Sequence, residues 1–376
     1  PAEGSATRSD IAITDPDFKY PSLWKSNIAA DYKFGDGWVA TVELLYSKDI
    51  NAIYHDNIGL YRTEQFVNDG GAGNARPYYN GYYSDREGNQ KAANHVVMLR
   101  NTSKGHSLYT TFQLQKNFVD GILKGLYLNG SYSFGQSRGV TDGTSSVATS
   151  AWKYRAALDG NAEEVGYTAG SFDGRLLLSA SYTANWSKYA ATSFGLIYQR
   201  YRPFRYSYCY NGDANGDSQF SNDLMYIPAN FDEVKDHLLP GDFDSQEDAW
   251  KAMNAFIEQD PYLSKHRGEY AERNGAVAPF ANQLDLSVSH DIKIYQKNGR
   301  SHTLRFSFNI ANFLNLLNRN WGVVQTTVLG NQQYQFLTIP KGQGPSAANN
   351  YTLKYTMAKD LDETFKDNLN DVSRWQ

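Results

Sequence analysis

Residues 283–313 read QLDLSVSHDIKIYQKNGRSHTLRFSFNIANF and contain two stretches in which apolar and polar residues alternate. Alternation with a period of two predicts β-strands, because successive side chains of a strand point to opposite faces. Both stretches exceed the roughly five or six residues of a typical strand and reach the roughly nine to eleven that cross a bilayer when tilted. The apolar positions are Leu284, Leu286, Val288, Ile292, Ile294, Leu304, Phe306, Phe308 and Ile310.

The connection between the two stretches predicts a hairpin. Residues 296–301 are polar and contain Asn298-Gly299, a dipeptide that favours a tight turn. The resulting hairpin has one apolar face and one face with charged side chains such as Asp285, Asp291 and Arg305. Such a division suits a sheet with lipid on one side and a water-filled lumen on the other.

Three further pairs of long alternating segments precede this hairpin, at residues 24–46, 108–134 and 176–198. Within each pair the connection is a few residues long. Between pairs lie long segments, approximately residues 55–105, 138–171, 210–280 and 315–370. Short turns on one side and long loops on the other are typical of outer-membrane barrels, whereas a β-sandwich has shorter strands and more even loops. We therefore predict an all-β fold, an antiparallel transmembrane β-barrel segment with long extracellular loops that carry short helices.

The composition of the chain limits the classes of protein to which it can belong. The chain is 41% hydrophobic with a mean hydropathy of -0.59, values that fit a barrel with polar inward positions. Its net charge of -4 gives no basic footprint for nucleic acid, which we exclude as a partner. The sequence contains no run of 18 apolar residues, so no transmembrane helix is predicted. The first residues do not resemble a signal peptide. We expect that a signal peptide lies upstream of them. The one cysteine, Cys209, is expected to be buried and not catalytic.

The loop at about residues 210–280 is predicted to carry a helical insertion. Ser245 followed by Asp248 resembles a capping box, and Trp250, Met253, Phe256 and Ile257 after it keep helical spacing. Asp260-Pro261 resembles the start of a second short helix, and Asn274-Gly275 resembles its end. Both helices are expected to pack on the extracellular mouth.

The same loop contains the one candidate metal site. In NGDANGDSQFSNDL, residues 211–224, oxygen-bearing side chains alternate in a pattern that could hold a hard cation such as calcium. The match is incomplete, because Ser218 replaces the usual glycine and Leu224 the usual twelfth-position acid. The alternative is a polar turn in which these side chains bind the local backbone, and the incomplete ligand set favours it. The candidate ligands are Asp213, Asn215, Asp217, Asn222 and Asp223.

A second loop stretch, GGAGNARPYYNGYYSD at residues 70–85, is rich in tyrosine. Tyrosines of this kind could stack on a ligand, although a self-packing loop is the simpler interpretation. No nucleophile elbow, zinc-protease motif or phosphate-binding glycine loop is present, so we expect neither catalysis nor a cofactor beyond the alternative of a structural calcium. The tyrosines are Tyr78, Tyr79, Tyr82 and Tyr83.

Several motifs together resemble the C-terminal half of TonB-dependent outer-membrane receptors, in the Oar-like branch that is related to SusC-like transporters. They are DPDFKYPSLWKSNIAADYKF, YSKDINAIYHDN, NGDANGDSQFSNDLMYIP, AFIEQDPYLSKHRGEYAERNGAVAPFANQLDLSVSHDI and FNIANFLNLLN. The resemblance reaches from Asp15 to Trp375 and is most specific between Phe256 and Ile292.

The resemblance implies a barrel of about 22 strands with an N-terminal plug. It also implies the outer membrane of a Gram-negative, Bacteroidetes-type bacterium as the location. This chain departs from the pattern because it shows eight clear strands and neither a plug nor a TonB box. We therefore expect residues 1–376 to form one domain, a C-terminal portion of a larger barrel.

Three functions are compatible with the sequence. The first is TonB-dependent uptake of a large or scarce solute. Its partners would be outer-membrane lipid, the rest of the barrel with its plug, the TonB complex and a SusD-like lipoprotein. The second is a surface adhesion or signalling protein on the same barrel. The third is a soluble β-rich carbohydrate-binding domain.

Overall fold

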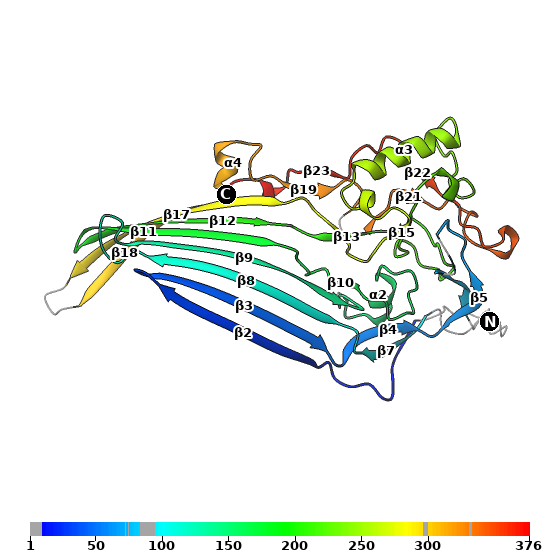
Figure 1. Cartoon of the computed structure of the whole chain (residues 1–376), viewed down its shortest axis with the longest axis horizontal. Helices are drawn as coiled ribbons and strands as arrows, with labels where there is room; N and C mark the ends of the chain where they lie inside the picture. The colour runs from blue at the N-terminus through cyan, green and yellow to red at the C-terminus, as the bar shows by residue number, and fades with distance from the viewer. Residues whose placement is uncertain are drawn as a thin grey trace, which may run out of the picture.

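The structure is a computed structural model that describes residues 10–71, 73, 75–82, 95–143, 145–295, 300–330 and 333–376. Its main feature is one curved antiparallel sheet, whose long strands lie side by side in Figure 1. The strands are hydrogen-bonded in chain order, and the short β10 (Gly166–Tyr167) pairs with β9. The long strands are β2 (Leu23–Phe34), β3 (Trp38–Asp49), β8 (His106–Asn117), β9 (Leu126–Gly139), β11 (Arg175–Ser187), β12 (Ala190–Tyr201), β17 (Ala281–Tyr295) and β18 (Ser301–Ile310).

The register between strands places the alternating positions on two common faces. Val288 of β17 lies between Phe194 of β12 and Phe308 of β18. On the opposite face, Asp291 pairs with Arg305. Because the side-chain period is two, this register keeps every apolar row of the sheet on the same side. Phe308 remains 63% exposed, so the apolar face is not covered by the rest of the described chain at this point.

The strand connections divide between the two ends of the sheet. Gly35 and Gly37 turn the chain from β2 to β3 with φ angles of 52° and 80°, a conformation that glycine adopts without strain. The other described short turns lie at the same end, and the long loops gather at the opposite end (Figure 1). The predicted Asn298-Gly299 turn falls outside the described residues. Aromatic rings mark the short-turn end, where Phe34 and Trp38 stack with centroids 6.1 Å apart.

The long loops form smaller sheets and short helices of their own. Their strands pair mainly within and between loops, for example β1 with β7 and β7 with β4. The elements are β1 (Ile11–Thr14), β4 (Ala52–Asn57), β5 (Leu60–Phe66), β6 (Pro77–Tyr82), β7 (Val96–Thr102), α2 (Ala148–Lys153), β13 (Arg205–Tyr208), β14 (Tyr226–Ile227), η1 (Phe231–Glu233), α3 (Gln246–Gln259), η2 (Leu263–Lys265), β15 (Glu269–Tyr270), β16 (Ala276–Val277), α4 (Phe313–Leu317), β19 (Val324–Thr327), β20 (Gln333–Tyr334), β21 (Leu337–Thr338), η3 (Ala347–Asn349), β22 (Thr356–Met357), β23 (Phe365–Asn368) and η4 (Asp371–Ser373).

The first helix predicted for the loop at 210–280 is present as α3. The Ser245 hydroxyl accepts the backbone N–H of Asp248 at 3.0 Å and caps the helix. Met253, Phe256 and Ile257 form the buried side of the helix, as their spacing predicts. Capping and periodicity thus located this helix correctly.

The second predicted helix is wrong. After Asp260 the chain makes only the short turn η2 and then β15, which pairs with β14. Gly268 has a φ of 80°, which a right-handed helix does not allow. Its N–H donates to the carbonyl of Ile227 instead of to a helical turn, so pairing across the loop outweighs the local cap signal.

The largest buried apolar cluster lies at the loop end of the molecule. It joins α3 to β13, β14 and the segment after β18 through side chains such as Tyr208, Phe256 and Phe336. The rings of Phe256 and Phe336 lie 4.8 Å apart, and those of Tyr208 and Tyr334 lie 5.3 Å apart. The loops therefore have a packed core of their own, which the sheet does not provide.

The prediction of a mainly antiparallel β fold with long strands is confirmed. Within the described residues the sheet runs from an edge at β2 to an edge at β18. Among the helices of the described part of the chain, none is long and apolar enough to cross a membrane.

Neighbouring residues of β8 provide a test of the two faces. We expect Phe112→Arg, on the apolar face, to destabilise the membrane-embedded protein by about 2–4 kcal/mol, because a charge there enters hydrocarbon. Gln113→Arg, one residue along and on the polar face, should cost less than about 1 kcal/mol. Denaturant unfolding in phospholipid vesicles measures both values. Equal costs would contradict the assignment of the faces.

Candidate functional site

The polar face of the sheet is the first candidate for contact with a solute. Side chains on neighbouring strands join across it: Asn27 donates to Glu43 at 2.7 Å, and Gln113 donates to Asn129 at 2.7 Å. Further along the face, Tyr127 donates to Gln115 at 2.8 Å. These bonds hold amide, hydroxyl and carboxylate groups in fixed positions on one surface. Such a surface suits the wall of a hydrated path.

One ion pair lies near the short-turn end of this face. Arg305 donates two hydrogen bonds to Asp291, with distances of 2.6 and 2.7 Å. The two-fold contact fixes the guanidinium plane against the carboxylate. Nearer the loop end of the same strand, Asp285 accepts the backbone N–H of Asn312 at 2.8 Å and ties the segment after β18 to the sheet. The three charged side chains predicted for this face, Asp285, Asp291 and Arg305, therefore bind groups of the same chain.

The loop that contains the candidate metal ligands closes on itself through hydrogen bonds. Asp213 accepts the backbone N–H groups of Asn215, Gly216 and Ser218 at 3.2, 2.6 and 2.8 Å. Asn215 accepts the N–H of Asp217 at 2.9 Å. These are the local backbone bonds that the polar-turn interpretation predicts.

The carboxyl groups of Asp217 and Asp223 are buried, and the positive charge near them does not offset the loss of contact with water. Asp217 is 1% exposed, and burial, with added repulsion from Asp223 and Asp213, raises its pKa well above the ordinary value. Burial also raises the pKa of Asp223 to about 7, although the Arg76 guanidinium beside it acts in the opposite direction. Both carboxyl groups are therefore easier to protonate than free ones.

The candidate ligands do not all converge. Asp223 turns toward Arg76 and the N–H of Ala214, while the buried side-chain oxygen of Asn222 has no hydrogen-bond partner in the part of the chain that the structure describes. Among the described residues, no group of three or more His, Cys, Asp or Glu side chains is arranged to hold a metal ion. A cation bound by Asp213, Asn215, Asp217, Asn222 and Asp223 stays a prediction.

One residue that connects this loop to the rest of the molecule through buried charge is Arg76, which the sequence did not single out. Its guanidinium is fully buried and donates to Asp69 at 3.0 Å and to Asp223 at 3.1 Å, and also to the carbonyl of Leu224. Tyr270 donates to the same Asp69 at 2.7 Å. Burial alone would lower the pKa of Arg76, but the two carboxylates raise it. One arginine thus joins the loop after β3 to the loop after β12.

A second buried carboxylate, Asp260, joins the loop after β12 to the segment after β18. It accepts hydroxyl hydrogen bonds from Tyr208 at 2.5 Å and Thr364 at 2.7 Å. Its other oxygen caps the turn by accepting the N–H groups of Tyr262 and Leu263 at 2.9 and 2.8 Å. The Asp-Pro pair in the sequence signalled the cap but not the contacts between segments.

Two buried arginines, Arg155 and Arg273, stabilise the loop after β9. Both bind backbone carbonyls, and the carbonyl of Val140 accepts a hydrogen bond from each. Burial, together with repulsion from Arg273, lowers the pKa of Arg155 to about 10. Their spacing in the sequence gives no sign of this pairing, because it depends on loops that meet only in the folded chain.

The described tyrosines of the tyrosine-rich stretch pack against residues of their own loop and of two other loops. Tyr79 is 2% exposed and donates to Asp159 at 2.6 Å, and Tyr82 is also buried beside His95. Tyr78 lies against Tyr351 with ring centroids 4.9 Å apart. Tyr83 falls outside the described residues. The described rings are therefore occupied by contacts within the protein, and only Tyr82 packs within its own loop as the self-packing interpretation predicts.

Cys209 is buried, as predicted. It lies in the loop core, and burial raises the pKa of its thiol well above the ordinary value. A thiol in this state is a poor nucleophile, so the residue serves packing.

Comparison with known proteins gives little similarity. No family model matches the chain, and no curated protein matches it. Among solved structures, the F5-1 variant of the FrpB iron transporter from Neisseria meningitidis shares 8% identity over 78% of this chain and 44% of that one, with a TM-score of 0.24. The F3-3 variant of the same transporter shares 8% identity over 77% of this chain and 43% of that one, with a TM-score of 0.23. The chain spans less than half the length of these transporters, and scores this low carry no argument about function.

We expect Arg76→Met to destabilise the protein by about 3–5 kcal/mol, because it leaves Asp69 and Asp223 buried without a partner. Arg62→Met is the control: Arg62 is half exposed and lies 3.4 Å from Asp159, and its loss should cost less than about 1 kcal/mol. Chemical unfolding in detergent measures both. Similar small losses would show that the buried cluster does not hold the loops together.

We expect Asp217→Asn to stabilise the protein at pH 7. The folded state holds the Asp217 proton to a higher pH than the unfolded state, so stability falls as pH rises from about 4 through the raised pKa. Asparagine removes this loss, so the gain in stability should grow as pH rises above about 4 and vanish at lower pH. Thermal unfolding at several pH values is the measurement.

The same variant tests the cation site. If these oxygens hold calcium, about 1 mM Ca²⁺ raises the melting temperature of the native protein, and Asp217→Asn abolishes the shift. A melting temperature that calcium does not change leaves the polar turn as the whole role of the loop.

Proposed function

We propose that this chain is part of an outer-membrane receptor that takes up a large or scarce solute with energy from the TonB complex. The observation that supports this function is the division of the sheet into an exposed apolar face and a hydrogen-bonded polar face. A soluble protein would cover an apolar surface of this extent, whereas lipid can cover it in a membrane.

In this function the two faces and the loops have separate roles. The polar face lines the path of the solute, and the packed loops at one end capture it outside the cell. The loops have their own core and their own buried ion pairs, so they offer a preformed surface rather than flexible chains. Preformed surfaces bind with a smaller entropic cost.

The finer assignments rest on sequence motifs. We infer membership of the Oar-like branch, a barrel of about 22 strands with a plug, and the outer membrane of a Bacteroidetes-type bacterium as the location. The partners that follow are the remaining strands and plug of the same barrel, the TonB complex and a SusD-like lipoprotein. The polar face contains no catalytic set among its described residues, and we assign no enzymatic step to it.

Two measurements test the proposal. The protein should remain in the membrane after carbonate washing and leave it only with detergent. Release by carbonate would favour the soluble carbohydrate-binding alternative. Cells that lack TonB should then lose uptake of the solute while still displaying the protein. If surface attachment or signalling persists without TonB and no uptake is found, the adhesion alternative replaces transport.

A further inference from the structure

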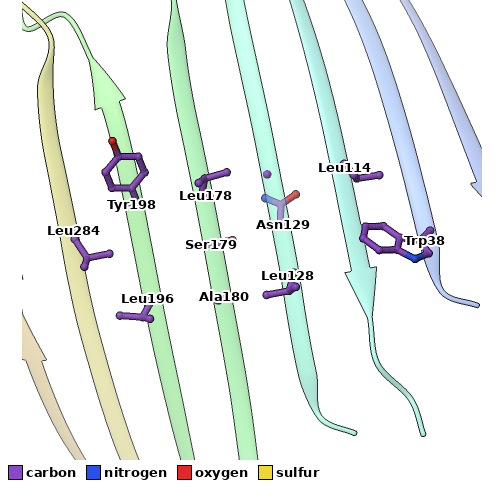
Figure 2. A pocket seen from close by; sticks show the side chains of 11 residues that line it. Trp38, Leu114, Leu128, Asn129, Leu178, Ser179, Ala180, Leu196, Tyr198 and Leu284 are labelled. Atoms are coloured by element: carbon purple, nitrogen blue, oxygen red, sulfur yellow. The ribbon is translucent and has the colours of Figure 1, made fainter. Parts of the chain in front are cut away.

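The apolar face of the sheet contains a hollow of about 430 Å³. Figure 2 shows that its wall comes from neighbouring strands, with Leu114, Leu128, Leu178, Leu196 and Leu284 around it and Trp38 at one side. The volume lies in the range of small-molecule sites. It is lined almost entirely by apolar atoms of the face that we assign to lipid.

The hollow results from two small residues in adjacent cross-strand rows. Gly130 lies between Leu114 and Leu178, and Ala180 lies between Leu128 and Leu196. Where the neighbouring rows carry large side chains, these two positions carry none or a single methyl group. The surface is therefore recessed at this point of the sheet.

A single cation stands at the edge of the hollow. Lys116 of β8 lies in register between Trp38 and Leu128, which both line it, and neighbouring side chains leave only 9% of it exposed. Its amine lies 5.5 Å from the Trp38 ring centroid and 5.1 Å from that of Phe118, beyond the end of the strand, so it points toward the short turns. Within the described residues Lys116 makes no ion pair. Lysines at membrane interfaces extend in this way to reach the headgroups.

We propose that this hollow and Lys116 together bind one anionic phospholipid, with an acyl chain in the hollow and the phosphate beside the Lys116 amine. The inference rests on the proposed function, because it requires lipid against this face. Charge complementarity selects the headgroup, and the apolar lining selects the chain. The short-turn end faces the periplasm in barrels of this type, so the lipid belongs to the inner leaflet.

At this site the lipid-facing surface would bind one kind of lipid specifically, whereas the rest of the surface would contact bulk lipid without preference. Bound there, the lipid would bridge β3, β8, β9, β11, β12 and β17 by filling the recess that Gly130 and Ala180 leave. Filling an apolar recess restores the dispersion contacts that its lining lacks. The lipid would therefore stabilise this part of the sheet as well as occupy it.

The test compares phosphatidylglycerol with phosphatidylcholine of the same chains by native mass spectrometry of the protein extracted from outer membranes in mild detergent. The native protein should bind phosphatidylglycerol about fivefold more tightly. Lys116→Gln should lose that preference but keep weak binding of both lipids. Ala180→Leu should lose both lipids, because it fills the hollow. The matched control is Lys33→Gln, an exposed lysine at the same end of the sheet on the polar face, which should change nothing.

Gly130→Leu provides a second filling variant if Ala180→Leu lowers the melting temperature, since the atom nearest to its new Cβ would be the mobile end of Leu178 at 3.0 Å. Equal binding of the two lipids by the native protein would overturn the inference. So would a loss in Lys33→Gln as large as in Lys116→Gln, or unchanged binding in both filling variants. A protein that carbonate releases from the membrane contradicts the proposed function itself, whereas a membrane-embedded protein without lipid preference contradicts only this site.

Discussion

The constraint on which this structure depends is that each long strand has one apolar face and one polar face, and each face needs surroundings that match it. Backbone groups in hydrocarbon have no water to bind, so they must pair with neighbouring strands, and the side chains on either face must match what they contact. The cross-strand register meets both demands, because it sets apolar rows against apolar rows and hydrogen-bonding rows against each other. A shift of one residue in any strand would exchange its two faces.

The loop end follows a different principle. There the chain buries charge, and each buried group needs a partner to offset the loss of water. Arg76 with Asp69 and Asp223, and Asp260 with Tyr208 and Thr364, meet that need across segments far apart in the sequence. Asp217 is the exception: it accepts hydrogen bonds from Gln219 and Asn215, but within the described residues it has no ion pair, and its raised pKa is the physical consequence of its burial. The two interpretations of the loop therefore differ at Asp217. A cation site needs its carboxyl group to be ionised, whereas a buried polar turn favours the protonated form.

The long-stranded sheet and the packed loops together support the proposed uptake function better than either part does alone. The sheet supplies a wall between lipid and water, and the loops supply a structured surface at one end of that wall. A recess in the apolar face, beside a lysine that makes no ion pair within the described residues, adds a feature that neither uptake nor adhesion requires. A uniform apolar surface would have neither the hollow nor the cation, and the proposed lipid site would use both.

The sequence by itself determined the sheet: its long strands, their two faces, the short turns and the helix capped by Ser245 all follow from local period and local caps, which depend only on near neighbours. It also located the acidic turn at residues 213–223. Only the tertiary structure decided which buried charges meet, because Arg76 and Asp223 are 147 positions apart and no local pattern connects them. The same holds for the second expected helix, which pairing between β14 and β15 replaced, and for the hollow, which exists because Gly130 and Ala180 come into adjacent rows of different strands. Contacts between distant segments depend on register, and register is a property of the assembled sheet.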